Sequence, residues 1–124
     1  MTITRIHSGG PFEKKVGYCR AVVAGNTVYV AGTCAQGETV PPDAAGQCAN
    51  ALGVIERALA EAGTSFAHVV RTTYYLPDIT EFESCWPHLR AAFGDNPPAA
   101  TVIEANLLDP RDRIEIEVTA VLPT

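Results

Sequence analysis

The segment RAVVAGNTVYVAG, residues 20–32, carries the clearest β-hairpin pattern of the chain. Two runs rich in β-branched residues flank Gly25 and Asn26, and both of these residues tolerate the positive φ angles that a tight hairpin turn requires. The sequence therefore predicts two adjacent antiparallel strands. Residues 2–7 are a candidate for a further edge strand, and residues 33–42 are predicted to form a loop.

A long amphipathic helix is predicted for residues 43–62. Leu52, Ile55 and Leu59 recur at spacings of three and four, which places them on one apolar stripe. Gly63 follows as a C-terminal stop, because glycine readily adopts the left-handed conformation that ends many helices. This stripe is expected to pack on a sheet.

A second helix is predicted to begin at the capping-box sequence TEFE, residues 80–83, and to continue to Phe93. The remaining strands are predicted at residues 69–76, 100–104 and 114–121. The resulting order, β-β-β-α-β-α-β-β, favours an α+β fold in which two helices pack on one face of a mixed β-sheet. The other face would be left bare, so we expect a second subunit to cover it.

Composition restricts the function classes. A chain of 124 residues, 47% of them apolar, suits a single domain spanning residues 1–124. The net charge of −5 argues against nucleic acid as a partner, because such binding needs clustered lysine and arginine. No apolar run is long enough for a membrane span or a secretory signal, so we expect a cytoplasmic protein that binds no membrane. The four cysteines are expected to be free thiols, and the three histidines lack the spacing of metal ligands, so no metal is predicted.

Four motifs, in order, resemble one family. They are GYCRAV with a following VAG (residues 17–32), AGTSFAHVVRTT (62–73), PAATV (98–102) and IEIE (114–117). Together they resemble the RidA/YjgF family of small proteins. The resemblance implies a chorismate-mutase-like α+β fold, a homotrimer, and small-molecule clefts between its subunits. It also implies hydrolysis of reactive imines and enamines released by pyridoxal-phosphate enzymes, without a metal or organic cofactor.

One motif departs from that pattern. In the best-known branch, an arginine in the third motif binds the carboxylate of the substrate, whereas this chain has Ala99, Ala100 and Thr101 there. A methyl group cannot replace a bidentate guanidinium. The chain therefore resembles an arginine-lacking branch, and we predict that it is not a classical 2-imino-acid deaminase. Trp86 also stands near the position of a family asparagine.

Two residues are predicted to be catalytic. Glu115 and Glu117 alternate with isoleucines and therefore share one face of a strand. The resemblance assigns Glu115 to positioning the hydrolytic water, while Glu117 is expected to be structural. Tyr18 matches the tyrosine of the family cleft, and its phenol would hydrogen-bond the ligand. The alternatives are a solvated strand face for the glutamates and a half-buried packing role for the tyrosine.

The other candidate ligand-binding residues are less specific. Arg20 is two residues beyond Tyr18 and on the same strand face, so it is a candidate for the missing cation, or else for a salt bridge. Cys34 is either a reactive thiolate or a small core residue. Trp86 would wall the cleft or pack between subunits. The candidate ligand-binding set is Arg20, Gly32, Thr33, Cys34, Trp86, Ala99, Ala100 and Thr101.

Two functions from different classes are compatible with these features. One is an enzyme that hydrolyses an imine, an enamine or a related small metabolite. The other is a non-catalytic trimer that binds a metabolite or partners another enzyme.

Overall fold

The predicted hairpin forms strands β2 (Ala21–Ala24) and β3 (Thr27–Thr33) in the computed structural model, which describes residues 2–124. Gly25 in the turn has φ of 61°, as a tight hairpin turn requires. Strand β1 (Ile3–Ile6) pairs antiparallel with β2 at the sheet edge. The hairpin and the predicted edge strand are thus confirmed.

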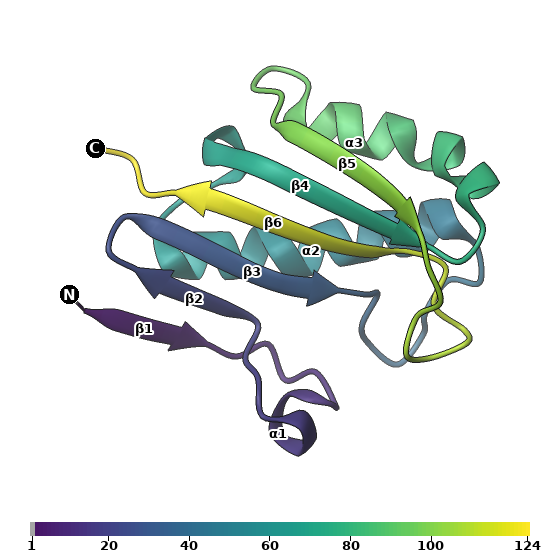
Figure 1. Ribbon diagram of the computed structural model, residues 1–124, viewed down its shortest axis with the longest axis horizontal. Coiled ribbons are helices and arrows are strands. Elements are labelled where there is room, and N and C mark those ends of the chain that lie inside the picture. The colour runs from purple at the N-terminus through teal and green to yellow at the C-terminus, as the bar shows by residue number, and fades with distance from the viewer. Residues whose placement is uncertain (1) are drawn as a thin grey trace.

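Within residues 2–124, six strands form one mixed sheet (Figure 1). Its other strands are β4 (Val69–Leu76), β5 (Ala99–Glu104) and β6 (Glu115–Val121), and the spatial order is β1-β2-β3-β6-β4-β5. Only the β4/β5 pair is parallel. Strand β6 pairs with both β3 and β4, so it joins the two halves of the sheet.

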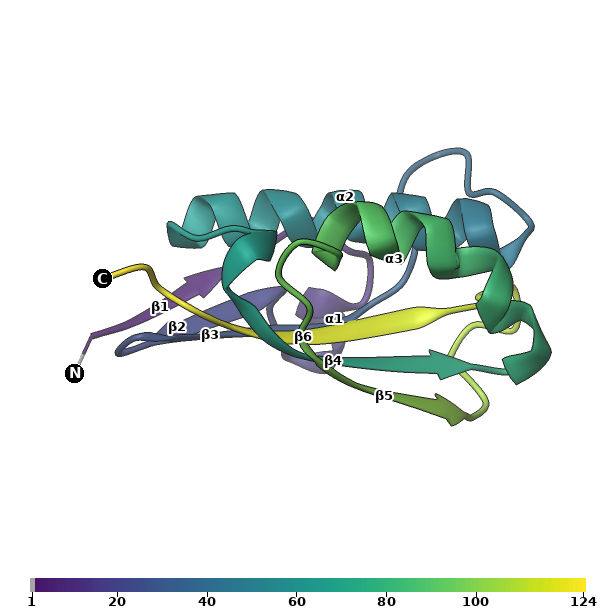
Figure 2. The ribbon, with the colours of Figure 1, turned by 90° about the horizontal axis from the view of Figure 1, so that it is seen from above.

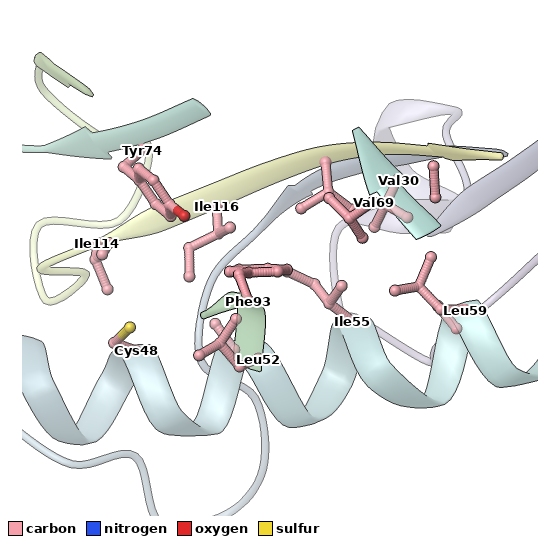
Figure 3. Close-up of a cluster of buried hydrophobic side chains, with 14 of the residues drawn as sticks. Val30, Cys48, Leu52, Ile55, Leu59, Val69, Tyr74, Phe93, Ile114 and Ile116 are labelled. Carbon is pink, nitrogen blue, oxygen red and sulfur yellow. The ribbon is translucent and has the colours of Figure 1, made fainter. Parts of the chain in front are cut away.

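The long helix α2 (Ala44–Ala62) matches the prediction at both ends. The side chain of Asp43 accepts a hydrogen bond from the Gly46 amide, and Gly63 ends the helix with φ of 95°. Its apolar stripe packs on the sheet, where Ile55 and Leu59 are fully buried (Figure 3). Helices α2 and α3 (Trp86–Phe93) lie on the same face of the sheet (Figure 2). Within residues 2–124, no helix covers the opposite face of the central strands.

The second helix begins later than predicted. Residues Ile79–Cys85 form a 3₁₀ helix, η2, and the α-helix starts only at Trp86. Asp78, rather than Thr80, caps this segment, because its carboxylate accepts hydrogen bonds from both the amide and the hydroxyl of Thr80. Pro87 has no N–H to donate to the carbonyl four residues earlier, which prevents an α-helix from running continuously through the segment.

Two short helical elements were not predicted. The 3₁₀ helix η1 (Phe66–His68) leads into β4, and the one-turn helix α1 (Glu13–Val16) precedes β2. The α1 segment contains the adjacent residues Lys14 and Lys15. Both lysines are exposed, but Glu13 is buried and becomes important for the candidate site.

The packing of α2 predicts a large loss of stability for Leu59→Ala. Leu59 is fully buried against the sheet, so the truncation should lower the free energy of unfolding by about 2–5 kcal/mol. Leu108→Ala is the matched control, because Leu108 is 76% exposed and its loss should cost less than about 0.5 kcal/mol. Urea unfolding at equal protein concentration measures both. Equal midpoints for the two variants would contradict this packing.

Candidate functional site

A large cavity lies at the end of β3 and the beginning of β6. It has a volume of about 1140 Å³ and is walled by loop residues 8–12, 34–42 and 108–113. Five predicted site residues line it, from three separate segments of the chain: Tyr18, Arg20, Gly32, Cys34 and Glu115. The structure therefore brings together the two predicted catalytic residues and three of the predicted ligand-binding ones.

Gly32 and Glu115 are in direct contact across the β3/β6 pair. A Cβ atom added at Gly32 would overlap the carboxylate of Glu115, so only glycine leaves room for this side chain. The register of the β3/β6 pair shifts between Val30 and Thr33, and this irregularity changes the direction of β3 beside the cavity. Thr33 itself is fully buried and donates a 2.7 Å hydrogen bond to the Ala31 carbonyl.

This contact predicts that Gly32→Ala displaces the Glu115 carboxylate. The new methyl group and the carboxylate cannot occupy the same space, so the side chain of Glu115 must move away from the cavity wall. A crystal structure of the variant should show Glu115 in another rotamer. Gly37→Ala serves as a contrast, because a Cβ there meets no atom and any effect comes from its φ of 116° alone. An unmoved Glu115 in Gly32→Ala would refute the prediction.

Arg20 is buried, with 2% of its surface exposed, and its guanidinium is directed at protein acceptors. Its Nε donates to Ser8 Oγ at 3.1 Å, and Nη1 donates to the Gly32 carbonyl at 2.8 Å and to Thr33 Oγ1 at 3.0 Å. Nη2 donates to Tyr18 Oη at 3.3 Å. Arg20 thus lines the cavity, but its N–H groups donate to residues of the protein and do not present a free pair of donors to a ligand.

Glu13 is the buried counter-charge of Arg20, at 3.5 Å from its Nη2. Its carboxylate accepts hydrogen bonds from the Ser8 hydroxyl at 2.6 Å and the Gly10 amide at 2.9 Å, and His7 Nδ1 lies 3.3 Å away. Burial raises the pKa of Glu13, but these hydrogen bonds and the charge of Arg20 outweigh it and hold the pKa below its usual value. Sequence reasoning missed this residue, because nothing in its spacing indicates burial.

The lowered pKa of Glu13 predicts an acid-sensitive contribution to stability. A carboxyl whose folded pKa lies below its unfolded value stabilises the fold above the unfolded pKa, and that stabilisation is lost as the pH falls through the folded pKa. The difference in unfolding free energy between wild type and Glu13→Gln should therefore be present at neutral pH and shrink as the pH falls below 4.5, the ordinary value. Urea unfolding across this range measures the difference.

The exposed Glu61 provides the control, since Glu61→Gln changes a surface side chain outside this cluster and should alter the unfolding free energy only slightly. A Glu13→Gln difference that stays constant into acid would contradict the lowered pKa.

Cys34 lies between two carboxylates. Its thiol donates to Glu115 Oε1 at 3.5 Å, and Asp112 approaches it as a second acceptor. Burial, together with the charges of Asp112 and Glu115, raises the pKa of the thiol far above its usual value. The thiol is therefore protonated, and the reactive-thiolate interpretation does not agree with this environment. Burial also raises the pKa of Asp112, a cavity residue that sequence reasoning missed.

The remaining predicted residues lie elsewhere in the chain. Trp86 and Ala100 line a second cavity of about 300 Å³ on the helical side of β5. Ala99 and Thr101 are exposed on the same edge strand. Ala99 pairs with Arg71 of β4, whereas Glu115 pairs with Tyr75, so this segment and the large cavity are apart within one chain. A ligand-binding role for residues 99–101 remains a prediction that would require a second copy.

Two absences concern the part of the chain that the structure describes. Residues 2–124 contain no group of three or more His, Cys, Asp or Glu side chains that could hold a metal ion. No helix in the same range is long and apolar enough to cross a membrane.

The sequence is similar to those of known proteins. The sequence profile described as Endoribonuclease L-PSP matches residues 11–122. A 2-iminobutanoate/2-iminopropanoate deaminase of Rattus norvegicus is 34% identical over 108 residues, 84% of this chain and 79% of the relative.

Solved structures give the same result. A member of the YjgF/YER057c/UK114 family from Mycobacterium tuberculosis is 39% identical, with a TM-score of 0.90 over 98% of this chain and 100% of the other. A YjgF family protein from Neisseria meningitidis is 30% identical, with a TM-score of 0.86 over 100% of this chain and 98% of the other. The predicted fold is thereby confirmed, and the chain belongs to the Endoribonuclease L-PSP, or YjgF/RidA, family.

Proposed function

We propose that this protein hydrolyses the C–N bond of a small imine or enamine in the cavity that contains Glu115 and Tyr18. The observation that carries the proposal is their convergence, from separate segments, on one cavity. A carboxylate that can accept a proton beside a phenol that can donate a hydrogen bond is a suitable pair for adding water to a C=N bond. The deaminase name of the rat relative supports the same reaction class.

The reaction can be written with groups of this chain alone. Glu115 accepts a proton from a water molecule as its oxygen bonds to the imine carbon, and the proton passes to the nitrogen. The hydroxyl proton of the resulting carbinolamine then passes through Glu115 to the nitrogen as the C–N bond breaks, which releases ammonia and leaves a carbonyl product. Tyr18 Oη accepts a hydrogen bond from Arg20, so its own proton is available to a ligand. The proposal invokes no metal or organic cofactor.

A homotrimer of this chain in the cytoplasm is part of the proposal. The sheet face opposite α2 carries no helix in residues 2–124 and exposes Tyr29, Ile103 and Val121. A neighbouring copy that covers this face would also place its own edge strand β5, which contains residues 99–101, next to the copy that it covers. Sedimentation at several concentrations tests the trimer.

A second candidate function is non-catalytic binding of a small metabolite. The observation in its favour is the hydrogen bonding of Arg20. Its N–H groups donate to protein acceptors, so this side chain cannot replace the absent arginine of the third motif. Thermal-shift screening separates the two functions. A compound that stabilises the protein and is recovered unchanged supports binding alone.

The test of hydrolysis is ammonia release from freshly generated imines of several classes. Acceleration of at least one class is expected. With 2-iminopropanoate we expect little acceleration, because loss of a charged hydrogen-bond pair typically costs about 2–5 kcal/mol, or roughly thirty-fold to several-thousand-fold. No acceleration with any imine would leave the binding function as the better account.

A further inference from the structure

Three of the four arginines that line the large cavity are already engaged by the protein. Four arginines line it: Arg20, Arg57, Arg111 and Arg113. Arg111 donates from both Nε and Nη2 to Asp109, at 3.1 and 2.7 Å. Arg113 donates in the same way to Glu81, at 2.9 and 3.0 Å. A guanidinium that already holds a carboxylate with two hydrogen bonds is less available to a second one, and the Arg111 side chain is 87% exposed, where an ion pair contributes little.

Arg20 and Arg57 do not provide a free, buried guanidinium for a ligand carboxylate either. The Nε and Nη groups of Arg20 point to Ser8, Gly32, Thr33 and Tyr18, and the side chain is buried. Arg57 is exposed on α2 and makes no ion pair within residues 2–124. An exposed arginine contributes little to an ion pair. The cavity therefore offers a ligand carboxylate no buried bidentate cation from this chain.

The carboxylates of Glu115 and Asp112, in contrast to the arginines, have no strong side-chain partner in the cavity. Glu115 and Asp112 share the Cys34 thiol as their side-chain donor, and a thiol is a weak one. In the described part of the chain, no N–H group hydrogen-bonds either carboxylate. Each therefore keeps lone pairs for a donor supplied by a ligand. Two partly buried carboxylates close together also disfavour any anion between them.

We infer that the cavity selects a small ligand that is cationic or a neutral hydrogen-bond donor at its C–N group, such as an iminium or amidinium, and rejects carboxylate anions. The N–H groups of the ligand would donate to Glu115 and Asp112, while the Tyr18 hydroxyl would donate to another polar atom. This inference rests on the proposed function, because it names the substrate class of the same cavity. It makes an iminium that carries no carboxylate the preferred substrate.

An isosteric series tests the inference without any turnover. Benzamidinium, benzamide and benzoate share a planar ring and differ in charge from positive to neutral to negative, and calorimetry or ligand-observed NMR gives their Kd values. The apolar side chains of Phe12, Val40 and Leu108 also line the cavity and suit the ring. We expect benzamidinium to bind at least about ten-fold more tightly than benzoate. Benzoate binding equally or more tightly, or no binding of any of the three, would overturn the inference.

Variants assign the preference to the two carboxylates. In the double variant Glu115→Gln/Asp112→Asn, the ratio of the benzoate and benzamidinium Kd values should fall to within about two-fold of one. Glu56→Gln removes one charge from the exposed surface of α2 and should keep the wild-type ratio. A wild-type ratio in a folded double variant would overturn the assignment, and if the double variant fails to fold, the wild-type ranking still decides.

The outcome is distinguishable from failure of the proposed function. Preference for benzamidinium with no imine hydrolysed would reject the enzyme and keep the ligand class. Preference for benzoate with imines hydrolysed would reject the ligand class and keep the enzyme.

Discussion

Glu115→Gln is expected to lower kcat for imine hydrolysis by about 100-fold to 10,000-fold, the range that a positioned general acid–base group usually contributes. Glutamine preserves the shape of the side chain and its packing over Gly32. It removes the ability to take a proton from water, which is the role proposed for this carboxylate. KM should change much less than kcat if the carboxylate acts mainly in the transition state.

Glu117→Gln is the matched control for this prediction. Glu117 is two residues further along β6 and shares the strand face of Glu115, but it is exposed and does not line the cavity. It accepts a 3.3 Å hydrogen bond from Tyr75, which glutamine can also accept. We expect activity within about three-fold of wild type. A similar loss in both variants would show that the charge of the sheet face matters, and not Glu115 as a catalytic group.

Arg20→Met is expected to lower the free energy of unfolding by about 3–5 kcal/mol, the usual result of removing one partner of a buried ion pair. Methionine keeps much of the apolar stem, so the loss reports on the guanidinium. Without it, the buried carboxylate of Glu13 loses the guanidinium 3.5 Å away, and the Gly32 carbonyl and Thr33 hydroxyl lose a donor. Because domains are stable by only about 5–15 kcal/mol, a large unfolded fraction is expected at moderate urea.

Arg57→Met provides the control, because the same substitution on the exposed surface of α2 should cost less than about 0.5 kcal/mol. Adding Glu13→Gln to Arg20→Met should recover part of the stability, since the uncompensated buried charge is then removed. Equal unfolding midpoints for Arg20→Met and Arg57→Met would contradict the proposed role of this ion pair.

The sheet and the long helix could be predicted because their signals are local. Alternation in the hairpin, the apolar stripe of α2, and Gly25 and Gly63 at turns and ends each depend on neighbouring residues alone. The start of the second helix was predicted too early, although the signals that set it are also local. Asp78 competes with Thr80 as the cap, and Pro87 blocks the α-helical hydrogen bond that an earlier start would need.

The residues in and around the cavity were predicted in part, and the missing part depends on distant contacts. Tyr18 and Glu115 were identified through the family resemblance, and the structure brings them to one cavity. Glu13 and Asp112 were missed, because their burial results from contacts with Arg20 and Cys34 that no spacing reveals. The hydrogen-bond partners of the Arg20 guanidinium could not be predicted either, since its four acceptors come from different segments of the chain.

The central place of β6 determines when this protein can acquire its site during synthesis. Strands β1–β3 and β4–β5 are held together by β6, which follows all of them in the sequence. A nascent chain that has not yet exposed residues 115–121 to solvent outside the ribosome has two unjoined half-sheets with open edges. Such edges favour pairing with other chains. Glu115 opens that same strand, so the cavity cannot form before residues 115–121 are available.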